Sequence, residues 1–178
     1  MLIVMAGLLG TGKSTLAGRL KAELGAVVLN KDEVRAVLFP PPVLDYSATQ
    51  DDVCMVAIYD AAAVILRTDP RRAVILDGRT FLRAYQLRDL LALAASLNET
   101  PHIIECVCDD EIVRQRLERD LARGGHPARN RTFALYLARK AAAEPIGAPR
   151  LVLDTGKTPL EECVKRSLEY IKTGERGA

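Results

Sequence analysis

A glycine-rich segment near the N-terminus has the residue types and the spacing that bind phosphate. Residues 7–14 read Gly-Leu-Leu-Gly-Thr-Gly-Lys-Ser and match the pattern G-x-x-x-x-G-K-[ST] at every position. Glycines allow such a loop to curl until its backbone N–H groups face phosphate oxygens. We expect the Lys13 ammonium to reach the β- and γ-phosphates and the Ser14 hydroxyl to bind Mg²⁺. The pattern therefore predicts a nucleoside triphosphate site formed by Gly7, Leu8, Leu9, Gly10, Thr11, Gly12, Lys13, Ser14 and Thr15.

Two charged residues follow the second apolar run of the chain. Asp32 and Arg35 come after Ala26–Leu29, and their spacing of three places them on one side of a helix. The Asp32 carboxylate can accept the proton of a substrate hydroxyl, a contribution of roughly 10²–10⁴-fold to a rate. The Arg35 guanidinium can hold an anionic group of the same acceptor. The alternative is structural: an acid favoured by the helix dipole and paired with an arginine one turn later.

Further candidates follow the third apolar run, which covers residues 73–76. Asp77 ends this run and is placed to hold a Mg²⁺-bound water, although an aspartate before Gly78 is also an ordinary turn residue. We expect the acceptor side of the site to include Arg79, Thr80 and Arg88. Arg88 lies on the next predicted helix, so the alternative for its side chain is a solvated face.

A helical pattern over residues 110–123 carries three arginines on one edge. At 100° per residue, Arg116, Arg119 and Arg123 lie within about 60° of each other. An apolar stripe beside them consists of Val113, Leu117 and Leu121. Three cations on one edge repel each other unless phosphate or acids lie opposite, so we expect them to face phosphate. A cation favoured at a helix C-terminus is the alternative for Arg123.

These candidates need a scaffold of alternating strands and helices. Apolar runs predict strands over 2–6, 26–29, 73–76, 102–108 and 151–153. Helical patterns predict helices over 13–24, from about 31 to the prolines at 40–42, and over 51–66, 83–97, 110–123, 132–143 and 159–172. Asn30 and Asp109 have the chemistry of N-caps, and Asp51 and Asp52 that of first-turn acids. Such an alternation predicts an α/β fold with a parallel sheet, whose ligands bind beyond the carboxyl ends of the strands.

Composition limits the class of protein further. The chain has 178 residues, 49% of them hydrophobic, which suits one domain with a packed core. A net charge of +2 is not that of a nonspecific nucleic-acid binder. No apolar run approaches the roughly 20 residues that cross a bilayer, so we expect no membrane partner. Without a disulfide framework or a signal-peptide pattern, we expect a cytoplasmic protein. We interpret its cysteines as core or surface thiols, with metal or redox chemistry as the alternative: Cys54, Cys106, Cys108 and Cys163.

In their order along the chain, these motifs resemble a known group of phosphotransferases. Residues 7–15 are followed by Leu-Asn-Lys-Asp-Glu-Val-Arg at 29–35, Asp-Gly-Arg-Thr-Phe at 77–81, Arg-Leu-Glu-Arg at 116–119 and the strand and loop at 151–155. This order is similar to that of the polynucleotide-kinase and zeta-toxin-like group, broadly described as AAA-domain kinases. Phage-type polynucleotide kinases carry a threonine–asparagine pair where this chain has Gly78 and Arg79, so the acceptor stays open.

The resemblance implies a three-layer P-loop NTPase fold with a five-stranded parallel sheet of order 2-3-1-4-5. It implies a single kinase domain over 1–178 with a helical lid at about 110–132, for which residues 124–127 are the natural hinge. It implies ATP and Mg²⁺ as cofactors, Asp32 as the base and Arg35 as a ligand of the acceptor phosphate. Catalytic roles then fall to Lys13, Arg119 and Arg123, and positions beside the nucleotide to Arg116, Asp154 and Thr155.

Two functions fit these residues. The first is an ATP-dependent kinase that phosphorylates a hydroxyl, either on a nucleic-acid 5′ end or on a small phosphorylated or nucleotide-like metabolite. The absence of an N-K-x-D guanine motif favours ATP over GTP. The second is a regulatory nucleotide-binding module that hydrolyses ATP slowly and has no dedicated acceptor. Nothing in the sequence indicates an obligate protein partner.

Overall fold

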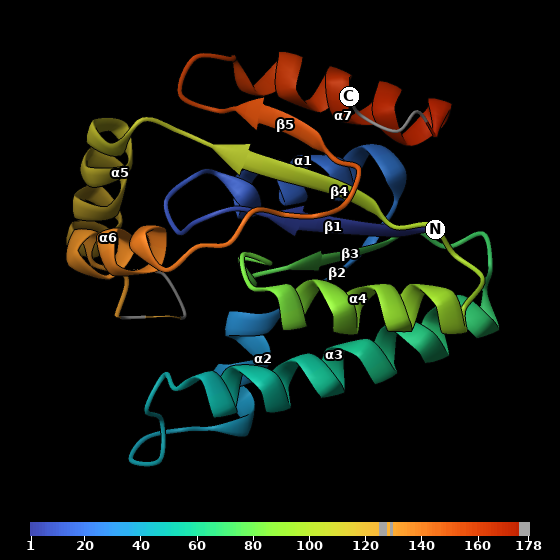
Figure 1. The fold of residues 1–178 in the computed structure, drawn as a ribbon, viewed down its shortest axis with the longest axis horizontal. Helices are drawn as coiled ribbons and strands as arrows, with labels where there is room; N and C mark the ends of the chain where they lie inside the picture. Colours follow the sequence, from blue (N-terminus) through green and yellow to red (C-terminus); the bar gives the residue numbers. More distant parts are fainter. Residues whose placement is uncertain (125–127, 129, 175–178) are drawn as a thin grey trace.

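The computed structural model describes residues 1–124, 128 and 130–174, and its centre is one parallel sheet (Figure 1). The sheet has the strand order β2-β3-β1-β4-β5, which confirms the predicted order. Its strands are β1 (Leu2–Ala6), β2 (Val27–Asn30), β3 (Val74–Asp77), β4 (His102–Val107) and β5 (Leu151–Asp154). Asn30 and Asp77 are register partners at the carboxyl ends of β2 and β3, so the polar residues after these strands start side by side.

Helices cover both faces of the sheet. They are α1 (Lys13–Leu24), α2 (Lys31–Leu38), α3 (Ala48–Thr68), α4 (Ala84–Ser96), α5 (Asp110–Arg123), α6 (Phe133–Ala141) and α7 (Leu160–Thr173). In Figure 1, α3 and α4 lie below the sheet and α7 lies above it, while α5 and α6 stand together beyond the carboxyl end of β4. The α/β architecture of three layers is therefore the predicted one.

The alternation of side chains along β1 builds two separate cores. Leu2 and Val4 face the side covered by α3 and α4, where they pack in one cluster with Ile58. Ile3 and Met5 face the side covered by α1 and α7 and belong to a second cluster. Because successive side chains of a strand point to opposite faces, a strand buried on both sides is apolar at every position. The continuous run of β1 follows from this geometry.

Most of the predicted helix ends are confirmed. Three details of the predicted helices are corrected: the start of α3, the cap of α5 and the apolar stripe of α5. Asn30 caps α2 as expected, since its Oδ1 accepts from the backbone N–H of Asp32 at 2.8 Å. The prediction for α3 was three residues late, because Ser47 caps that helix and accepts from the Gln50 N–H at 3.2 Å. Asp109 stands at the N-cap of α5 but makes no capping hydrogen bond through its side chain. The predicted apolar stripe of α5 ends early, because Leu121 is 64% exposed.

The four cysteines are free thiols, three of them in the core. Cys54, Cys106 and Cys163 are buried, and Cys108 is half-buried. Burial raises the pKa of the Cys106 thiol to about 12. Within the described ranges, no three His, Cys, Asp or Glu side chains form a group suited to a metal ion. None of the described helices is both long enough and apolar enough to span a membrane.

Candidate active site

The phosphate-binding loop connects β1 to α1 and is shaped by its glycines. Gly7 has φ +118°, and a Cβ at this position would collide with the backbone oxygen of Cys106. Only glycine fits there, because the left-handed φ and the close approach to β4 both exclude a side chain. The Thr11 hydroxyl and the Lys13 ammonium each donate to the Leu8 carbonyl at 2.7 Å, which holds the loop in a tight turn.

Lys13 and Asp77 form the buried base of this loop. Both are nearly covered, with exposed fractions of 8% and 2%. Burial lowers the pKa of Lys13, and the nearby Asp77 carboxylate acts in the opposite direction. Asp77 Oδ2 accepts from Asn30 Nδ2 at 2.8 Å, whereas its Oδ1 contacts no donor among the described residues. A buried carboxylate oxygen without a donor, close to the Lys13 cation, suits a role toward Mg²⁺ and its waters.

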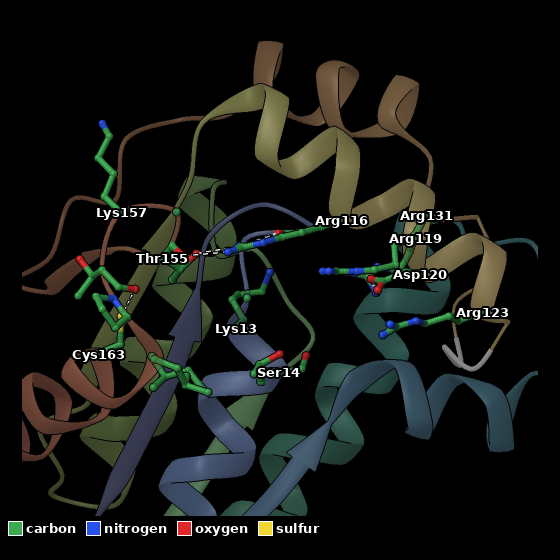
Figure 2. A pocket seen from close by; sticks show the side chains of 18 residues that line it. Lys13, Ser14, Arg116, Arg119, Asp120, Arg123, Arg131, Thr155, Lys157 and Cys163 are labelled. Carbon is green, nitrogen blue, oxygen red and sulfur yellow. Dashed lines mark hydrogen bonds and ion pairs between the residues drawn. The ribbon is translucent and has the colours of Figure 1, made fainter.

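A cavity with a volume of about 870 Å³ lies over the loop (Figure 2). The loop contributes Gly10, Gly12, Lys13, Ser14 and Thr15 to its lining, while Gly7, Leu8 and Thr11 shape the loop from outside the cavity. All three arginines predicted on one edge of α5 line this cavity: Arg116, Arg119 and Arg123. Thr155 lines it from the loop after β5. The volume is that of a site for a molecule of nucleotide size.

Asp154 does not line either cavity, although the resemblance placed it beside the nucleotide. Its Oδ1 accepts from the backbone N–H groups of Gly156 and Lys157 at 3.0 and 3.2 Å. The side chain therefore fixes the loop after β5 and leaves the wall of the cavity to Thr155 and the residues that follow.

Arg116 links α5 to the phosphate-binding loop. Its guanidinium donates to the Thr155 hydroxyl at 3.0 Å and to the Thr155 carbonyl at 2.8 Å (Figure 2). The same hydroxyl donates to the Thr11 carbonyl at 2.8 Å. Thr155 thus joins three elements that surround the larger cavity: α5, the loop after β5 and the phosphate-binding loop.

A smaller cavity of about 110 Å³ adjoins the first. Lys13, Ser14 and Arg131 line both cavities, so the two meet beside the phosphate-binding loop. Of the residues predicted for the acceptor side, four line the smaller cavity: Asp32, Arg35, Arg79 and Thr80. The structure thus brings the proposed base and the acceptor arginines to one place beside the loop.

Arg88, which was also predicted for the acceptor side, lies apart from these residues. Its guanidinium pairs with Asp89 at 3.1 Å, and its side chain is 74% exposed. The residue lines neither cavity, because its position on α4 turns it toward solvent. This was the structural alternative for Arg88.

Asp32 and Arg35 belong to a dense charge network between α2 and α3. Arg35 donates to Asp32 Oδ1 at 3.0 Å and to Asp51 Oδ1. The Lys31 ammonium lies 3.0 Å from Asp51 and 3.3 Å from Asp32. Burial lowers the pKa of Lys31 to about 8. Asp51 is therefore more than a first-turn acid of α3: it is a partner of two buried cations.

Arg79 repeats this arrangement one residue further along α3. It donates to Asp52 Oδ1 at 2.6 Å and to the Tyr85 hydroxyl at 3.3 Å. Arg35 and Arg79 are each only 4% exposed. Each acceptor-side arginine is thus buried and held by one of two consecutive aspartates.

Sequence reasoning missed five charged residues at the smaller cavity or its charge network: Lys31, Asp51, Asp52, Arg131 and Arg139. Arg131 pairs with Asp120 at 3.3 Å and, among the arginines that the structure describes, it alone lines both cavities. Lys31 could have been predicted as part of the site, because it precedes Asp32 in the sequence. The two aspartates gave no signal, since their partners come from segments that are distant in sequence.

The predicted lid corresponds in part to α5 and α6, which pack on each other. Val113, Leu117 and Tyr136 form a small core of their own. The Tyr136 hydroxyl donates to Asp110 Oδ1 at 2.6 Å. Of the predicted hinge, Gly124 ends α5 with φ +62°. The rest of that hinge, Gly125, His126 and Pro127, lies outside the described residues.

Comparison with known proteins agrees with this geometry. A family model described as an AAA domain matches residues 2–145. An adenylyl-sulfate kinase of Bacillus velezensis is 28% identical, with 94% of this chain and 83% of that protein covered. A gluconokinase from Sinorhizobium meliloti has the same fold, with a TM-score of 0.69, 18% identity and coverage of 97% and 91%. Kti12 of Chaetomium thermophilum, solved in complex with ADP-AlF3, gives a TM-score of 0.72, 20% identity and coverage of 97% and 98%.

The family match spans most of the chain, and it includes the phosphate-binding loop, the paired charges after β2 and α5. The chain therefore belongs to the AAA-domain family, and it is a P-loop kinase.

Proposed function

We propose that this kinase transfers the γ-phosphoryl group of ATP, bound with Mg²⁺, to a hydroxyl of a small metabolite, with Asp32 as the general base. The observation that carries the proposal is the meeting of two cavities at Lys13, Ser14 and Arg131. A phosphoryl transfer needs donor and acceptor on opposite sides of the transferred group. The larger cavity suits ATP, and the smaller one, which contains Asp32, suits the acceptor.

The donor side provides contacts for phosphate charge. Backbone N–H groups of the loop and the positive end of α1 attract the phosphates, and the Lys13 ammonium turns from the Leu8 carbonyl toward them. Mg²⁺, when bound, neutralises charge that develops on the phosphate oxygens. Ser14 and Asp77 would hold it, and the donor-free Asp77 Oδ1 supports this assignment. A site with few protein ligands suits Mg²⁺, which keeps several waters and binds through phosphates.

The acceptor side provides the base. The Asp32 carboxylate takes the proton of the acceptor hydroxyl while its oxygen attacks the γ-phosphorus. The new O–P bond forms as the bond to the bridging β,γ-oxygen breaks, and ADP leaves with that electron pair. Arg119, Arg123 and Arg131 line the larger cavity, and we assign them the neutralisation of charge on the transferred group. The proton then passes from Asp32 to solvent, which restores the base.

The test uses Asp32→Asn, which keeps the size of the side chain and removes the base. We expect acceptor-dependent ADP release to fall by about 10²–10⁴-fold, while the affinity for ATP, measured by calorimetry, stays within about twofold. Glu33→Gln is the matched control, since Glu33 lies beside Asp32 and lines neither cavity. ADP release that is independent of any acceptor and unchanged in Asp32→Asn would instead favour the regulatory ATPase module.

A further inference from the structure

Asn30 lies between the two carboxylates to which the proposed function gives different tasks. It ends β2, and its register partner Asp77 ends β3. Its side-chain Nδ2 donates to Asp77 Oδ2 at 2.8 Å, and its Oδ1 accepts from the backbone N–H of Asp32 at 2.8 Å. The same oxygen accepts from the Glu33 N–H at 3.3 Å. One amide side chain thus contacts both the residue assigned to Mg²⁺ and the residue assigned as the base.

These contacts together require the amide of an asparagine. The Asn30 oxygen faces two backbone N–H groups, so the NH₂ end of the amide faces the Asp77 carboxylate. An aspartate at this position would keep the cap but would place one carboxylate against another, because an ionised carboxylate only accepts. A serine caps a helix equally well, but its short side chain has no second arm for Asp77. The side chain of Asn30 therefore does more than a helix cap requires.

The contact with Asp77 decides which of its carboxylate oxygens is available. Asp77 is almost fully buried, and Asn30 occupies its Oδ2. Its Oδ1 is buried and has no donor among the described residues. A carboxylate that is anchored through one oxygen holds the other in a fixed direction. Partners of this kind orient carboxylates at metal sites, and their loss costs roughly 10–100-fold in metal affinity or activity.

The contact with Asp32 fixes the start of α2. Asp32 lies in the first turn of this helix, and its own backbone N–H is one of the two that Asn30 holds. Its carboxylate is held separately, because Oδ1 lies 3.0 Å from Arg35 Nη1 and 3.3 Å from Lys31 Nζ. A general base must lie within hydrogen-bond reach of the proton that it takes. The position of this first turn therefore matters for the chemical step.

The ends of β2 and β3 also approach each other closely through their backbones. Gly78 follows Asp77 and has φ +90°. A Cβ on Gly78 would lie 3.0 Å from the backbone nitrogen of Lys31 and 3.3 Å from Asn30 Oδ1. The chain that leaves β3 thus runs directly against the start of α2. This tight packing restrains Asn30 in the arrangement that makes both contacts.

We propose that Asn30 is a positioning residue of this kinase, which fixes the Mg²⁺-side carboxylate of Asp77 and the base Asp32 relative to each other. The inference rests on the proposed function and deepens it, because that function assigns the roles of these two residues. Asn30 lines neither cavity, so it acts through the residues that it holds. Its substitution affects the Mg²⁺-dependent part of nucleotide binding and the chemical step.

The first test removes one contact and keeps the other. Asn30→Ser retains a cap for α2 and removes the donor to Asp77. Calorimetry measures the affinity for the β,γ-imido analogue of ATP, once with Mg²⁺ and once with EDTA. We expect the gain in affinity that Mg²⁺ gives to fall by about tenfold in the variant. If Asn30 serves only as a cap, this gain keeps its wild-type value, and the inference is overturned.

A double-mutant cycle shows whether Asn30 acts through Asp77. In an Asp77→Asn background, Asn30→Ser should change the gain from Mg²⁺ by less than about twofold, since the carboxylate that Asn30 orients is no longer there. Independent action predicts that the tenfold loss recurs in this background. That result contradicts a role of Asn30 toward Asp77.

Asn30→Ala tests the second contact, because it removes the cap together with the donor. We expect the gain from Mg²⁺ to equal that of Asn30→Ser. Transfer of label from γ-³²P-ATP to a cell metabolite extract, at saturating Mg²⁺ and ATP, should be about tenfold slower than in Asn30→Ser, since the first turn of α2 loses its anchor. Equal transfer in Asn30→Ser and Asn30→Ala overturns the role toward Asp32.

Ile171→Val is the matched control for stability. It removes one methylene from the core beneath α7, and Ile171 lines neither cavity. We expect its urea unfolding midpoint to fall as in the Asn30 variants, with label transfer and the gain from Mg²⁺ unchanged. If Ile171→Val loses both as Asn30→Ala does, instability explains the losses and the inference fails.

The calorimetric measurement separates this inference from the proposed function. If Asp32→Asn transfers label at the wild-type rate while Asn30→Ser behaves as expected, the proposed base fails. The Asp32 part of this inference then fails with it, and the Asp77 part stands. If Asp32→Asn is impaired while Asn30→Ser keeps the wild-type gain from Mg²⁺, the inference fails and the proposed function stands.

Discussion

The two cavities of this kinase are built in different ways. The phosphate side of the larger one comes from a continuous segment, residues 7–15, and depends on backbone groups and glycine conformations. The smaller one collects side chains from β2–α2, β3–α4, α3 and the lid, and depends on pairs of opposite charges. A site built from backbone groups tolerates almost no substitution at its glycines. In a site built from paired side chains, substitution of a single charged pair can change the specificity.

The largest effect is expected at Gly7. Gly7→Ala forces a Cβ toward the Cys106 carbonyl at a left-handed φ, so we expect a loss of roughly 3 kcal/mol or more in unfolding free energy and of measurable ATP binding. Gly18→Ala is the matched control, because a Cβ there meets nothing within 4 Å, and it should stabilise α1 by up to about 1 kcal/mol. Denaturant unfolding and calorimetry check both. Normal ATP binding in Gly7→Ala would contradict a backbone-defined site.

A smaller effect is expected at Arg131, where the two cavities meet. Arg131→Ala removes a charge that faces the transferred group, so kcat should fall by about 10²–10³-fold. Stopped-flow measurement of a single turnover isolates the chemical step. Arg114→Ala should leave kcat unchanged, since Arg114 pairs with Glu111 and Glu118 on the exposed side of α5. Equal effects of the two substitutions would remove Arg131 from the junction.

Lys31, in the charge network beside Asp32, makes the stability of the fold depend on pH. Lys31, beside Asp32, Asp51, Arg35 and Arg79, has a folded pKa of about 8, below its usual 10.5, because it is buried. Between these two pH values the unfolded chain binds more protons, so stability rises with pH across this window, by up to roughly 3 kcal/mol. Urea unfolding at pH 7 and pH 10 measures the rise.

Lys31→Arg supplies the control for that experiment, because an arginine does not titrate in this range. The rise in stability should be smaller in the variant, and what remains is expected from Lys13, whose pKa is also lowered by burial. A rise of the same size in both proteins would assign the pH dependence to other groups.

The smallest effect is expected at Arg88. Arg88→Ala should change unfolding free energy by less than about 0.5 kcal/mol and leave the KM for the acceptor unchanged, because its side chain is solvated. Arg35→Ala, in contrast, should raise the acceptor KM. A raised KM in Arg88→Ala would instead bring Arg88 on α4 into the acceptor site.

The same contrast explains which residues of the two cavities could be predicted from the sequence. The loop at 7–15, the strand order and the cap at Asn30 follow from local patterns and from the resemblance that these patterns carry. Asp32 and Arg35 were accessible too, because they are neighbours on one helix. The partners Asp51 and Asp52 were not, since an acid in a first turn has a sufficient local explanation. The exposed position of Arg88 was not accessible either, because helical spacing does not say how a helix is oriented relative to the sheet.

The measurement that tests the central claim most directly follows the label from γ-³²P-ATP in the presence of Mg²⁺ and a cell metabolite extract. If donor and acceptor cavities meet as described, the label appears in a small phosphate ester, and Asp32→Asn reduces that product by about 10²–10⁴-fold. Label that appears only as inorganic phosphate, in equal amounts for both proteins, would contradict the account.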